Sequence, residues 1–179
     1  MDEGQIIQNQ RLQRLLTDGG SLIKRLQAEG IKQPTINLLN QRWCYPAQDE
    51  RMHLAISSRR YILEREVLIE SEGTPLVFAR TVFPAQTLTG KEKMLGKLGT
   101  RSLGSVLFNK PNLQRSEFEF TCLQPYMKLY QRMSQYTKMD NLSLWARCSL
   151  FFIQHKSLLL TEVFLPQLIE KITHLRPTV

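Results

Sequence analysis

The chain has 179 residues, 42% of them hydrophobic, and its 24 Lys and Arg residues against 16 Asp and Glu residues give a formal net charge of +8. This length and apolar content fit one domain, 1–179, that closes a core without a disulfide, a metal or a partner. No window approaches the roughly 18 apolar residues that a membrane span needs, and MDEGQIIQNQ lacks the pattern of a signal peptide. We therefore expect a cytoplasmic protein with no membrane span.

The positive charge would suit nucleic acid, an anionic membrane or a small anionic ligand. The Lys and Arg residues are scattered, without a run of five and without an aromatic-studded RNA-binding motif. We expect no nucleic acid partner, although charge alone does not distinguish a basic solvated surface from the steering of an anion.

Cysteine and histidine spacing gives no indication of a metal site. Three cysteines lie far apart and in no CxxC pair, namely Cys44, Cys122 and Cys148. Three histidines have no HxxxH spacing and are interpreted as surface or turn residues, namely His53, His155 and His174. We expect no metal and no cofactor.

The N-terminal part of the chain predicts a pair of helices. Apolar residues from Ile6 to about Leu16 recur at helical spacing, and Asp18-Gly19-Gly20 ends the pattern. Ser21 can cap a second helix, SLIKRLQAE, which Gly30 ends.

Beyond Pro34 the apolar period changes to two, which predicts strands over 35–44, 61–69 and 76–83, the last two joined as a hairpin by the turn SEGTP. Short helical segments follow over 91–98 and 103–108, then a strand over 114–122 and an ambiguous, partly helical stretch over 124–141. Segments 144–154 and 158–165 predict a second hairpin that turns at His155-Lys156-Ser157, before a weak helix over 167–174. Short connections require antiparallel pairing, so we expect an α+β fold with one antiparallel sheet of about six strands and flanking helices.

Three charged residues fall in apolar rows of these strands. Arg65 shares a face of RYILEREVLIE with apolar residues, and we expect the opposite face, with Glu64 and Glu66, to be the wetter one. In SLLLTEVFLP both rows are apolar, so Glu162 lies in an apolar row on either face, and Arg80 repeats this pattern.

An isolated buried charge costs several kcal/mol, so such groups need a partner or a ligand. One explanation is an ion pair between strands, joining Arg65 or Arg80 to Glu162. The other is a sheltered pocket in which an arginine receives a carboxylate and the glutamate meets a hydroxyl or a proton. The segment GTRSLGSVLF also has two interpretations. It is either a simple turn before a helix or a segment whose backbone N–H groups bind an anion.

Four blocks of the sequence resemble the chorismate lyase (chorismate pyruvate-lyase) family, in the family's order and spacing: YILEREVLIESEGTPLVFARTVFP, LGKLGTRSLGSVLF, LWARCSLFFI and SLLLTEVFLP. The resemblance runs from about Leu15 to Pro166. It implies helical flaps over a buried ligand site and the cofactor-free conversion of chorismate to 4-hydroxybenzoate and pyruvate. The product of such enzymes supplies ubiquinone, plastoquinone or phenolic lipid biosynthesis.

The resemblance also implies roles for particular residues. Arg65 matches the family's arginine that binds the ring carboxylate, and Glu162 matches its active-site glutamate. Leu103 matches a leucine whose backbone helps to hold the ligand. Leu22 stands where the family has a methionine, a swap that a contact through the main chain tolerates. Arg80 matches a family arginine for which we favour a structural role.

The alternative is a non-catalytic domain of the same fold that binds an aromatic or enolpyruvyl acid, because effector domains of a class of bacterial transcription regulators share this fold. Those regulators carry a winged helix-turn-helix ahead of the effector domain, for which the roughly 30 residues before the first predicted strand are too few. We therefore expect an enzyme. We also expect a monomer, because the predicted sheet and helices cover every apolar stripe.

Overall fold

The structure, a computed structural model, describes residues 10–138 and 141–174. Seven strands form one sheet in the order β1-β2-β3-β7-β6-β4, and β5 also pairs with β6; all pairs are antiparallel. The strands are β1 Thr35–Cys44, β2 Ile62–Ser71, β3 Thr74–Pro84, β4 Leu113–Arg115, β5 Glu119–Leu123, β6 Leu144–Ile153 and β7 Lys156–Phe164. The helices are α2 Gln10–Thr17, α3 Leu22–Ala28, α4 Gln48–Leu54, the 3-10 helix η1 Gly90–Lys97, α5 Leu103–Leu107, α6 Lys128–Met133 and α7 Pro166–His174.

The predicted α+β fold with one antiparallel sheet is confirmed. The sheet has seven strands rather than about six, because the strand expected over 114–122 is two short strands, β4 and β5, that both pair with β6. None of the helices that the structure describes is long and apolar enough to cross a membrane.

Both predicted hairpins are present. In the β2–β3 turn, Glu72 and Gly73 have φ angles of 53° and 74°, the left-handed conformation that a tight hairpin turn requires and that the sequence SEGTP supplies. The β6–β7 hairpin turns at Gln154, with a φ of 59°, and His155, so it closes about one residue earlier than expected and β7 begins at Lys156.

The predicted helical pair corresponds to α2 and α3, and Gly30, with a φ of 89°, follows the end of α3. The expected start of the first helix, at 6–9, lies outside the described residues. Helix α4 was not predicted, because its sequence, QDERMHL, is short and mostly polar. The ambiguous stretch over 124–141 contains only one short helix in its described part, α6.

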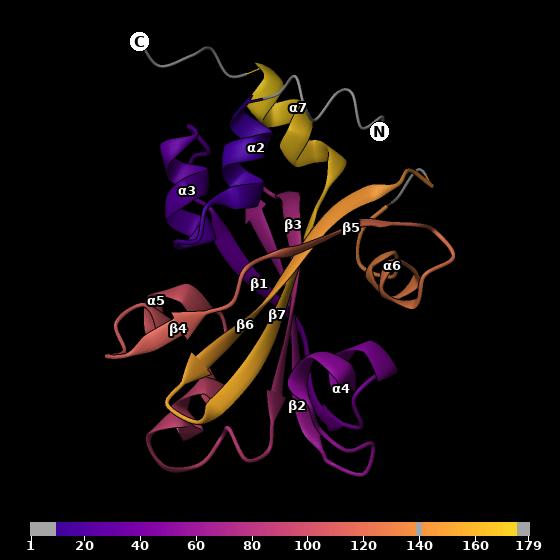
Figure 1. The fold of residues 1–179 in the computed structure, drawn as a ribbon. Helices are drawn as coiled ribbons and strands as arrows, with labels where there is room; N and C mark the ends of the chain where they lie inside the picture. The colour runs from indigo at the N-terminus through magenta and orange to yellow at the C-terminus, as the bar shows by residue number, and fades with distance from the viewer. Residues whose placement is uncertain (1–9, 139–140, 175–179) are drawn as a thin grey trace.

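Different helices cover the two faces of the sheet, which Figure 1 shows nearly edge-on. Helices α2, α3, η1, α5 and α7 pack on the face that carries Arg65 and Glu162, here called the cavity face. Helices α4 and α6 pack on the other, here called the cluster face. On each face two apolar clusters lie at opposite ends of the sheet, with polar side chains between them.

The expectation that the Glu64 and Glu66 side of β2 is the wetter one is wrong. Both side chains are fully buried on the cluster face. The Nη1 of Arg80 donates to Glu64 Oε2 at 2.7 Å and to Glu66 Oε1 at 2.8 Å, and its Nε donates to Glu50 Oε1 at 2.7 Å. Arg42 and Arg132 also pair with these carboxylates.

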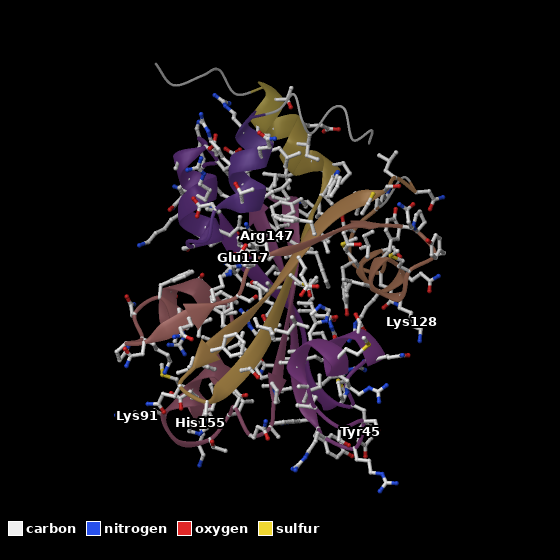
Figure 2. All side chains as sticks on the ribbon, viewed as in Figure 1. Tyr45, Lys91, Glu117, Lys128, Arg147 and His155 are labelled. Atoms are coloured by element: carbon white, nitrogen blue, oxygen red, sulfur yellow. The ribbon has the colours of Figure 1, made fainter. Side chains whose placement is uncertain are left out.

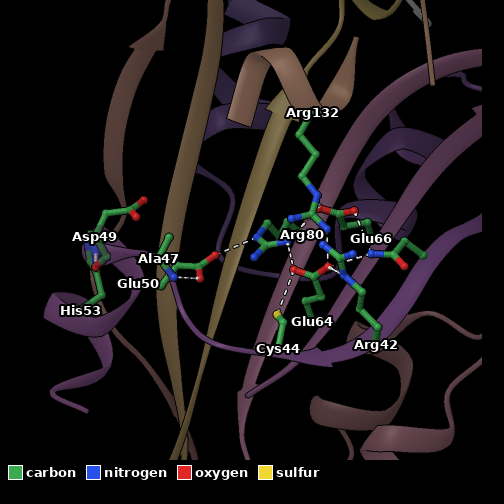
Figure 3. A network of polar contacts seen from close by, with 11 residues as sticks. Arg42, Cys44, Ala47, Asp49, Glu50, His53, Glu64, Glu66, Arg80 and Arg132 are labelled. Carbon is green, nitrogen blue, oxygen red and sulfur yellow. Dashed lines mark hydrogen bonds and ion pairs between the residues drawn. The ribbon is translucent and has the colours of Figure 1, made fainter. Parts of the chain in front are cut away.

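These residues form the Glu64–Arg80 cluster, defined as Arg42, Glu50, Glu64, Glu66, Arg80 and Arg132 (Figure 3). Three guanidinium groups balance three carboxylates, which is how the sheet can bury charge on this face. Burial alone would raise the pKa of Glu64, but Arg80, Arg42 and Arg132 outweigh it and lower that pKa to about 2.

Candidate functional site

A cavity lies on the cavity face, between its two apolar clusters. Strands β2, β3 and β7 form its floor, and the start of α3 together with α5 covers it. The free space that it encloses is about 50 Å³. This volume is below the roughly 300–1,000 Å³ typical of small-molecule sites, so the covering segments lie close to the floor.

Strand β3 makes room for the cavity because it contributes only small side chains to the floor. Ala79 pairs with Val67 of β2 and with Glu162 of β7, while Thr81 pairs with Arg65 of β2. Arg65 and Glu162 therefore stand on one face, two strands apart, with Ala79 and Thr81 between them. All four residues line the cavity.

Arg65 brings a buried charge to this cavity without a carboxylate partner. Its side chain is 2% exposed, and its Nη2 donates to the backbone oxygens of Gly99 and Arg101, at 2.9 and 3.0 Å. Among the described residues, its buried Nε has no hydrogen-bond partner and no carboxylate forms an ion pair with it. Burial lowers the pKa of Arg65 to about 10. A buried guanidinium in this state favours an anionic ligand.

Two other arginines hold Glu162. The Nε of Arg147 donates to Glu162 Oε2 at 2.7 Å, and the Nη2 of Arg115 lies 3.6 Å from the same oxygen. Arg147 is 1% exposed, and its Nη1 also donates to the backbone oxygens of Leu15, Leu16 and Asp18. Figure 2 shows Arg147 near the centre of the molecule. Both arginines thus fix one carboxylate oxygen, and no described residue donates a hydrogen bond to Oε1.

The charges around the cavity do not balance. Two buried or nearly buried guanidinium groups, those of Arg65 and Arg115, line it with a single carboxylate, Glu162. The buried Arg147, which is outside the lining, already pairs with that carboxylate. Burial is the largest influence on Arg115 and lowers its pKa to about 10, against the opposing effect of Glu162. The resulting excess of two positive charges in a sheltered space matches a ligand with two negative charges.

The two covers of the cavity meet above this floor. Leu22 begins α3 and Leu103 begins α5, and both line the cavity with Ser21 and Gly104. A Cβ on Gly104 would lie 3.4 Å from Ser21 Oγ and 3.2 Å from a ring carbon of Phe108. Glycine at this position therefore allows the two covering segments to touch.

The structure brings together all four residues singled out from the sequence, Arg65, Glu162, Leu103 and Leu22. The hypothesis of an ion pair between Arg65 or Arg80 and Glu162 is wrong, because Glu162 pairs with Arg147 and Arg115 instead. Arg80 lies on the cluster face, paired with three glutamates, as a structural role requires.

Sequence reasoning missed Arg115 and Arg147. Arg147 had a detectable signature, a charge inside the apolar strand LWARCSLFFI, which is the same pattern that singled out Arg65. Arg115 lies in the three-residue strand β4, which is too short to show an alternating pattern.

The histidines lie away from this cavity. His155 is exposed in the β6–β7 turn, as expected (Figure 2). His53 is a half-buried residue of α4 on the cluster face, beside Glu119 and Cys148. The side chain of His174 lies outside the described residues.

Comparisons with known proteins point to one family. The family model described as "Chorismate lyase" matches residues 4–174. A protein named "Probable chorismate pyruvate-lyase" from Aromatoleum aromaticum (strain DSM 19018 / LMG 30748 / EbN1) is 36% identical over 162 residues, which cover 89% of this chain and 87% of the relative. A relative of the same name from Methylobacillus flagellatus is 33% identical over 155 residues, covering 87% of this chain and 86% of the relative.

Solved structures of transcription regulators have a similar fold. A GntR family transcriptional regulator from Bacillus cereus superposes with a TM-score of 0.58 at 15% identity, covering 83% of this chain and 99% of that one. The effector domain of PhnF from Mycobacterium smegmatis gives a TM-score of 0.56 at 13% identity, covering 83% and 90%. At such low identity the similarity shows a shared fold alone.

Proposed function

Because this chain belongs to the chorismate lyase family, we propose that it is a chorismate pyruvate-lyase that converts chorismate to 4-hydroxybenzoate and pyruvate in the cavity between Arg65 and Glu162. Chorismate carries two carboxylates, so the excess of two positive charges around the cavity fits it. The single observation that carries the assignment is the buried Arg65 guanidinium, which lines the cavity with a free Nε and no carboxylate partner among the described residues.

The reaction requires little chemistry from the protein. The bond between C3 and the enolpyruvyl oxygen breaks, C4 loses its hydrogen as a proton, and the released enolpyruvate takes up a proton to become pyruvate. Because the ring becomes aromatic, the step is intrinsically downhill. The protein therefore mainly has to hold the enolpyruvyl group in an eliminating geometry and to exclude water.

Arg65 would bind the ring carboxylate. Its planar guanidinium matches the two oxygens of a carboxylate, and the backbone oxygens of Gly99 and Arg101 already fix its orientation. Leu103, at the start of α5, and Leu22, at the start of α3, would contact the ligand through their main chains.

Glu162 would face the 4-hydroxyl group of the substrate. Arg147 holds Oε2 at 2.7 Å, so Oε1 is the oxygen that can accept a hydrogen bond from that hydroxyl. A carboxylate fixed in this way positions the ring without having to reorganise during the reaction.

Removing either charged group tests the assignment. We expect Glu162→Ala and Arg65→Ala each to reduce turnover by about 10²-fold or more, the range typical of losing a positioned acid, base or electrostatic contact. Formation of 4-hydroxybenzoate from chorismate is followed by absorbance. Arg59→Ala, which removes an exposed guanidinium six residues before Arg65, is the control and should keep the wild-type rate.

Near-wild-type rates in both variants would refute the assignment. Calorimetry with chorismate separates the enzyme from the alternative, a non-catalytic domain of this fold that binds an aromatic or enolpyruvyl acid. Binding without formation of 4-hydroxybenzoate by the wild-type protein would favour the alternative.

The wider setting is also part of the proposal. We infer a cofactor-free reaction of a cytoplasmic monomer whose product enters ubiquinone, plastoquinone or phenolic lipid biosynthesis. The cytoplasmic assignment is supported by three cysteines that are all free thiols, Cys44, Cys122 and Cys148.

A further inference from the structure

A second group of reactive side chains lies on the cluster face, where α4 meets β5 and β6. The Nε2 of His53 lies 3.1 Å from Glu119 Oε2 and 3.8 Å from Cys148 Sγ. The three ligand atoms are all within 4.8 Å of one another. We propose that His53, Glu119 and Cys148 bind one Zn²⁺ ion, on the face of the sheet opposite the candidate active site.

The neighbours of His53 favour a metal at Nε2. The Nδ1 of His53 lies 2.8 Å from the backbone oxygen of Asp49, an atom that can only accept, so Nδ1 carries a proton. Figure 3 shows the two residues side by side on α4. Glu119 Oε2 can also only accept, so without a metal Nε2 donates a proton to it across 3.1 Å; zinc would replace that proton and bind the lone pair of Nε2. A backbone carbonyl that fixes the tautomer in this way is a common feature of metal-binding histidines.

The distances also suit zinc. Bond lengths of about 2.0–2.3 Å to nitrogen, oxygen and sulfur in a tetrahedral site place neighbouring ligand atoms roughly 3.3–3.7 Å apart. The distances of 3.1 and 3.8 Å from His53 Nε2 bracket that range. Nitrogen, carboxylate and thiolate ligands together suit Zn²⁺ better than the hard cations Mg²⁺ and Ca²⁺.

The site is open enough to be loaded. All three residues line a pocket of about 550 Å³ on the cluster face, and the Glu119 side chain is 70% exposed. An ion can therefore enter, and a water molecule can occupy the fourth tetrahedral position. On binding, bonds to zinc replace the proton on the sulfur of Cys148 and the proton on Nε2 of His53, and both protons pass to solvent.

A cysteine–histidine pair can also be a nucleophile and its base, but the surroundings disfavour that reading. Glu119 contacts the same ring nitrogen as the thiol. A carboxylate that orients a catalytic histidine contacts the other nitrogen.

Zinc would have a structural role. It would join α4 to the edge of the sheet formed by β5 and β6, and α4 carries Glu50, which pairs with Arg80 inside the Glu64–Arg80 cluster. Because the ion binds the folded state, it should stabilise the fold. None of its ligands lines the cavity on the other face, so the inference does not depend on the proposed lyase activity.

Cobalt substitution tests the site in the untagged, full-length protein. After chelator treatment, one equivalent of Co²⁺ should give the absorption spectrum of a tetrahedral site with a thiolate-to-cobalt charge-transfer band. We expect Cys148→Ser to abolish that band, and Glu119→Gln and His53→Ala to weaken Zn²⁺ binding about 10-fold or more in competition with a chromophoric chelator.

Two neighbours supply matched controls. Cys122→Ser changes the half-buried cysteine of β5, and Glu117→Gln changes an exposed carboxylate two residues from Glu119; both should keep wild-type binding. Saturating Zn²⁺ should raise the wild-type Tm by several degrees and leave that of Cys148→Ser unchanged. Glu119 is exposed, so its variant should fold even if a change at Cys148 disturbs packing.

Absence of a thiolate band in the wild-type protein would overturn the inference. So would a band that survives in Cys148→Ser, or Zn²⁺ affinity that is the same in Glu119→Gln and Glu117→Gln. Lyase activity is not a readout in any of these measurements, so failure of the zinc site and failure of the proposed function are distinguishable.

Discussion

Arg147 is the residue that links the candidate site to the rest of the molecule. Its Nε holds Glu162, and its Nη1 donates to three backbone oxygens at the end of α2 and just after it. A lysine keeps the charge but cannot make these contacts at once, because its donors are on a single nitrogen. We therefore expect Arg147→Lys to lower kcat about 10-fold or more, measured by steady-state kinetics with chorismate.

Arg115→Lys is the comparison for this prediction. Arg115 lines the cavity, but it lies 3.6 Å from Glu162, whereas Arg147 lies at 2.7 Å. A lysine at position 115 should therefore raise KM more than it lowers kcat. The positioning role of Arg147 would be wrong if kcat fell further in the Arg115 variant, with both variants showing a wild-type Tm.

At the residue scale, a charge that interrupts an apolar row of a predicted strand indicated a buried charge but not its role. Arg65 and Glu162 showed this pattern and line the cavity, whereas Arg80 showed it and is paired on the other face. The resemblance to a family separated the two cases. The partners of Glu162 could not be predicted, because which residues of β6 and β4 lie beside β7 depends on strand order and register. His53 and Glu119 escaped for the same reason: 66 positions separate two residues that are in contact.

At the scale of the elements, two segments cover the cavity. The start of α3 and the helix α5 meet where Gly104 approaches Ser21, with the Cβ position of one residue 3.4 Å from the side chain of the other. A side chain at position 104 would therefore meet the side chain of residue 21, so we choose these two positions for an engineered disulfide. If product leaves by movement of these covers, a Ser21→Cys/Gly104→Cys disulfide should slow release about 10-fold or more, since release often limits turnover.

Rapid mixing with 4-hydroxybenzoate measures that release rate. A reducing agent should restore the rate of the double variant, and Ser21→Cys alone should behave as the wild-type protein does in both conditions. An oxidised double variant that releases product at the wild-type rate would show that product leaves by another route.

The alternation of glutamates with apolar residues in β2 did not show which face of the strand is exposed to solvent. A row of alternating glutamates looks the same in the sequence whether water or guanidinium groups face it. Here Arg42 from β1, Arg80 from β3 and Arg132 from α6 converge on Glu64 and Glu66. The row is buried because those elements pack against it. One of them, α6, lies in a stretch for which the sequence prediction was ambiguous.

At the scale of the whole molecule, both faces of one sheet carry charge, but the two faces differ in balance. The cluster face pairs three arginines with three glutamates, whereas the cavity face leaves two positive charges uncompensated. Since every strand of the described residues joins this sheet, we propose that residues 1–179 form a single domain. We interpret the balanced face as structural and the unbalanced face as the one that binds substrate.

The balanced face predicts how the fold responds to acid. The folded-state pKa of Glu64 is lowered from 4.5 to about 2, so between these values the unfolded state binds more protons than the folded one. The stabilisation is complete above about pH 4.5 and is lost as the pH falls toward 2; a shift of this size corresponds to an effect on the order of 3 kcal/mol. Denaturant titrations at several pH values should show stability falling across this window.

Glu64→Gln should be less stable at neutral pH, because it leaves buried guanidinium groups without their partner, and its stability should depend less on pH below 4.5. Glu117→Gln, outside the cluster, should follow the wild-type curve. A Glu64→Gln curve parallel to that of the wild-type protein would show that this carboxylate is not what couples folding to pH.

The unbalanced face and the net charge of +8 predict how substrate association responds to salt. Chorismate is a dianion and 4-hydroxybenzoate a monoanion, so screening should weaken the capture of chorismate more. Between about 0.02 and 0.2 M salt the Debye length falls from roughly 20 to 7 Å, and we expect kcat/KM to fall several-fold while kcat stays nearly constant. The inhibition constant of 4-hydroxybenzoate, measured over the same range, should change by about the square root of that factor. Equal salt dependence for both ligands would mean that local contacts at Arg65, rather than the excess of positive charge, determine the capture of substrate.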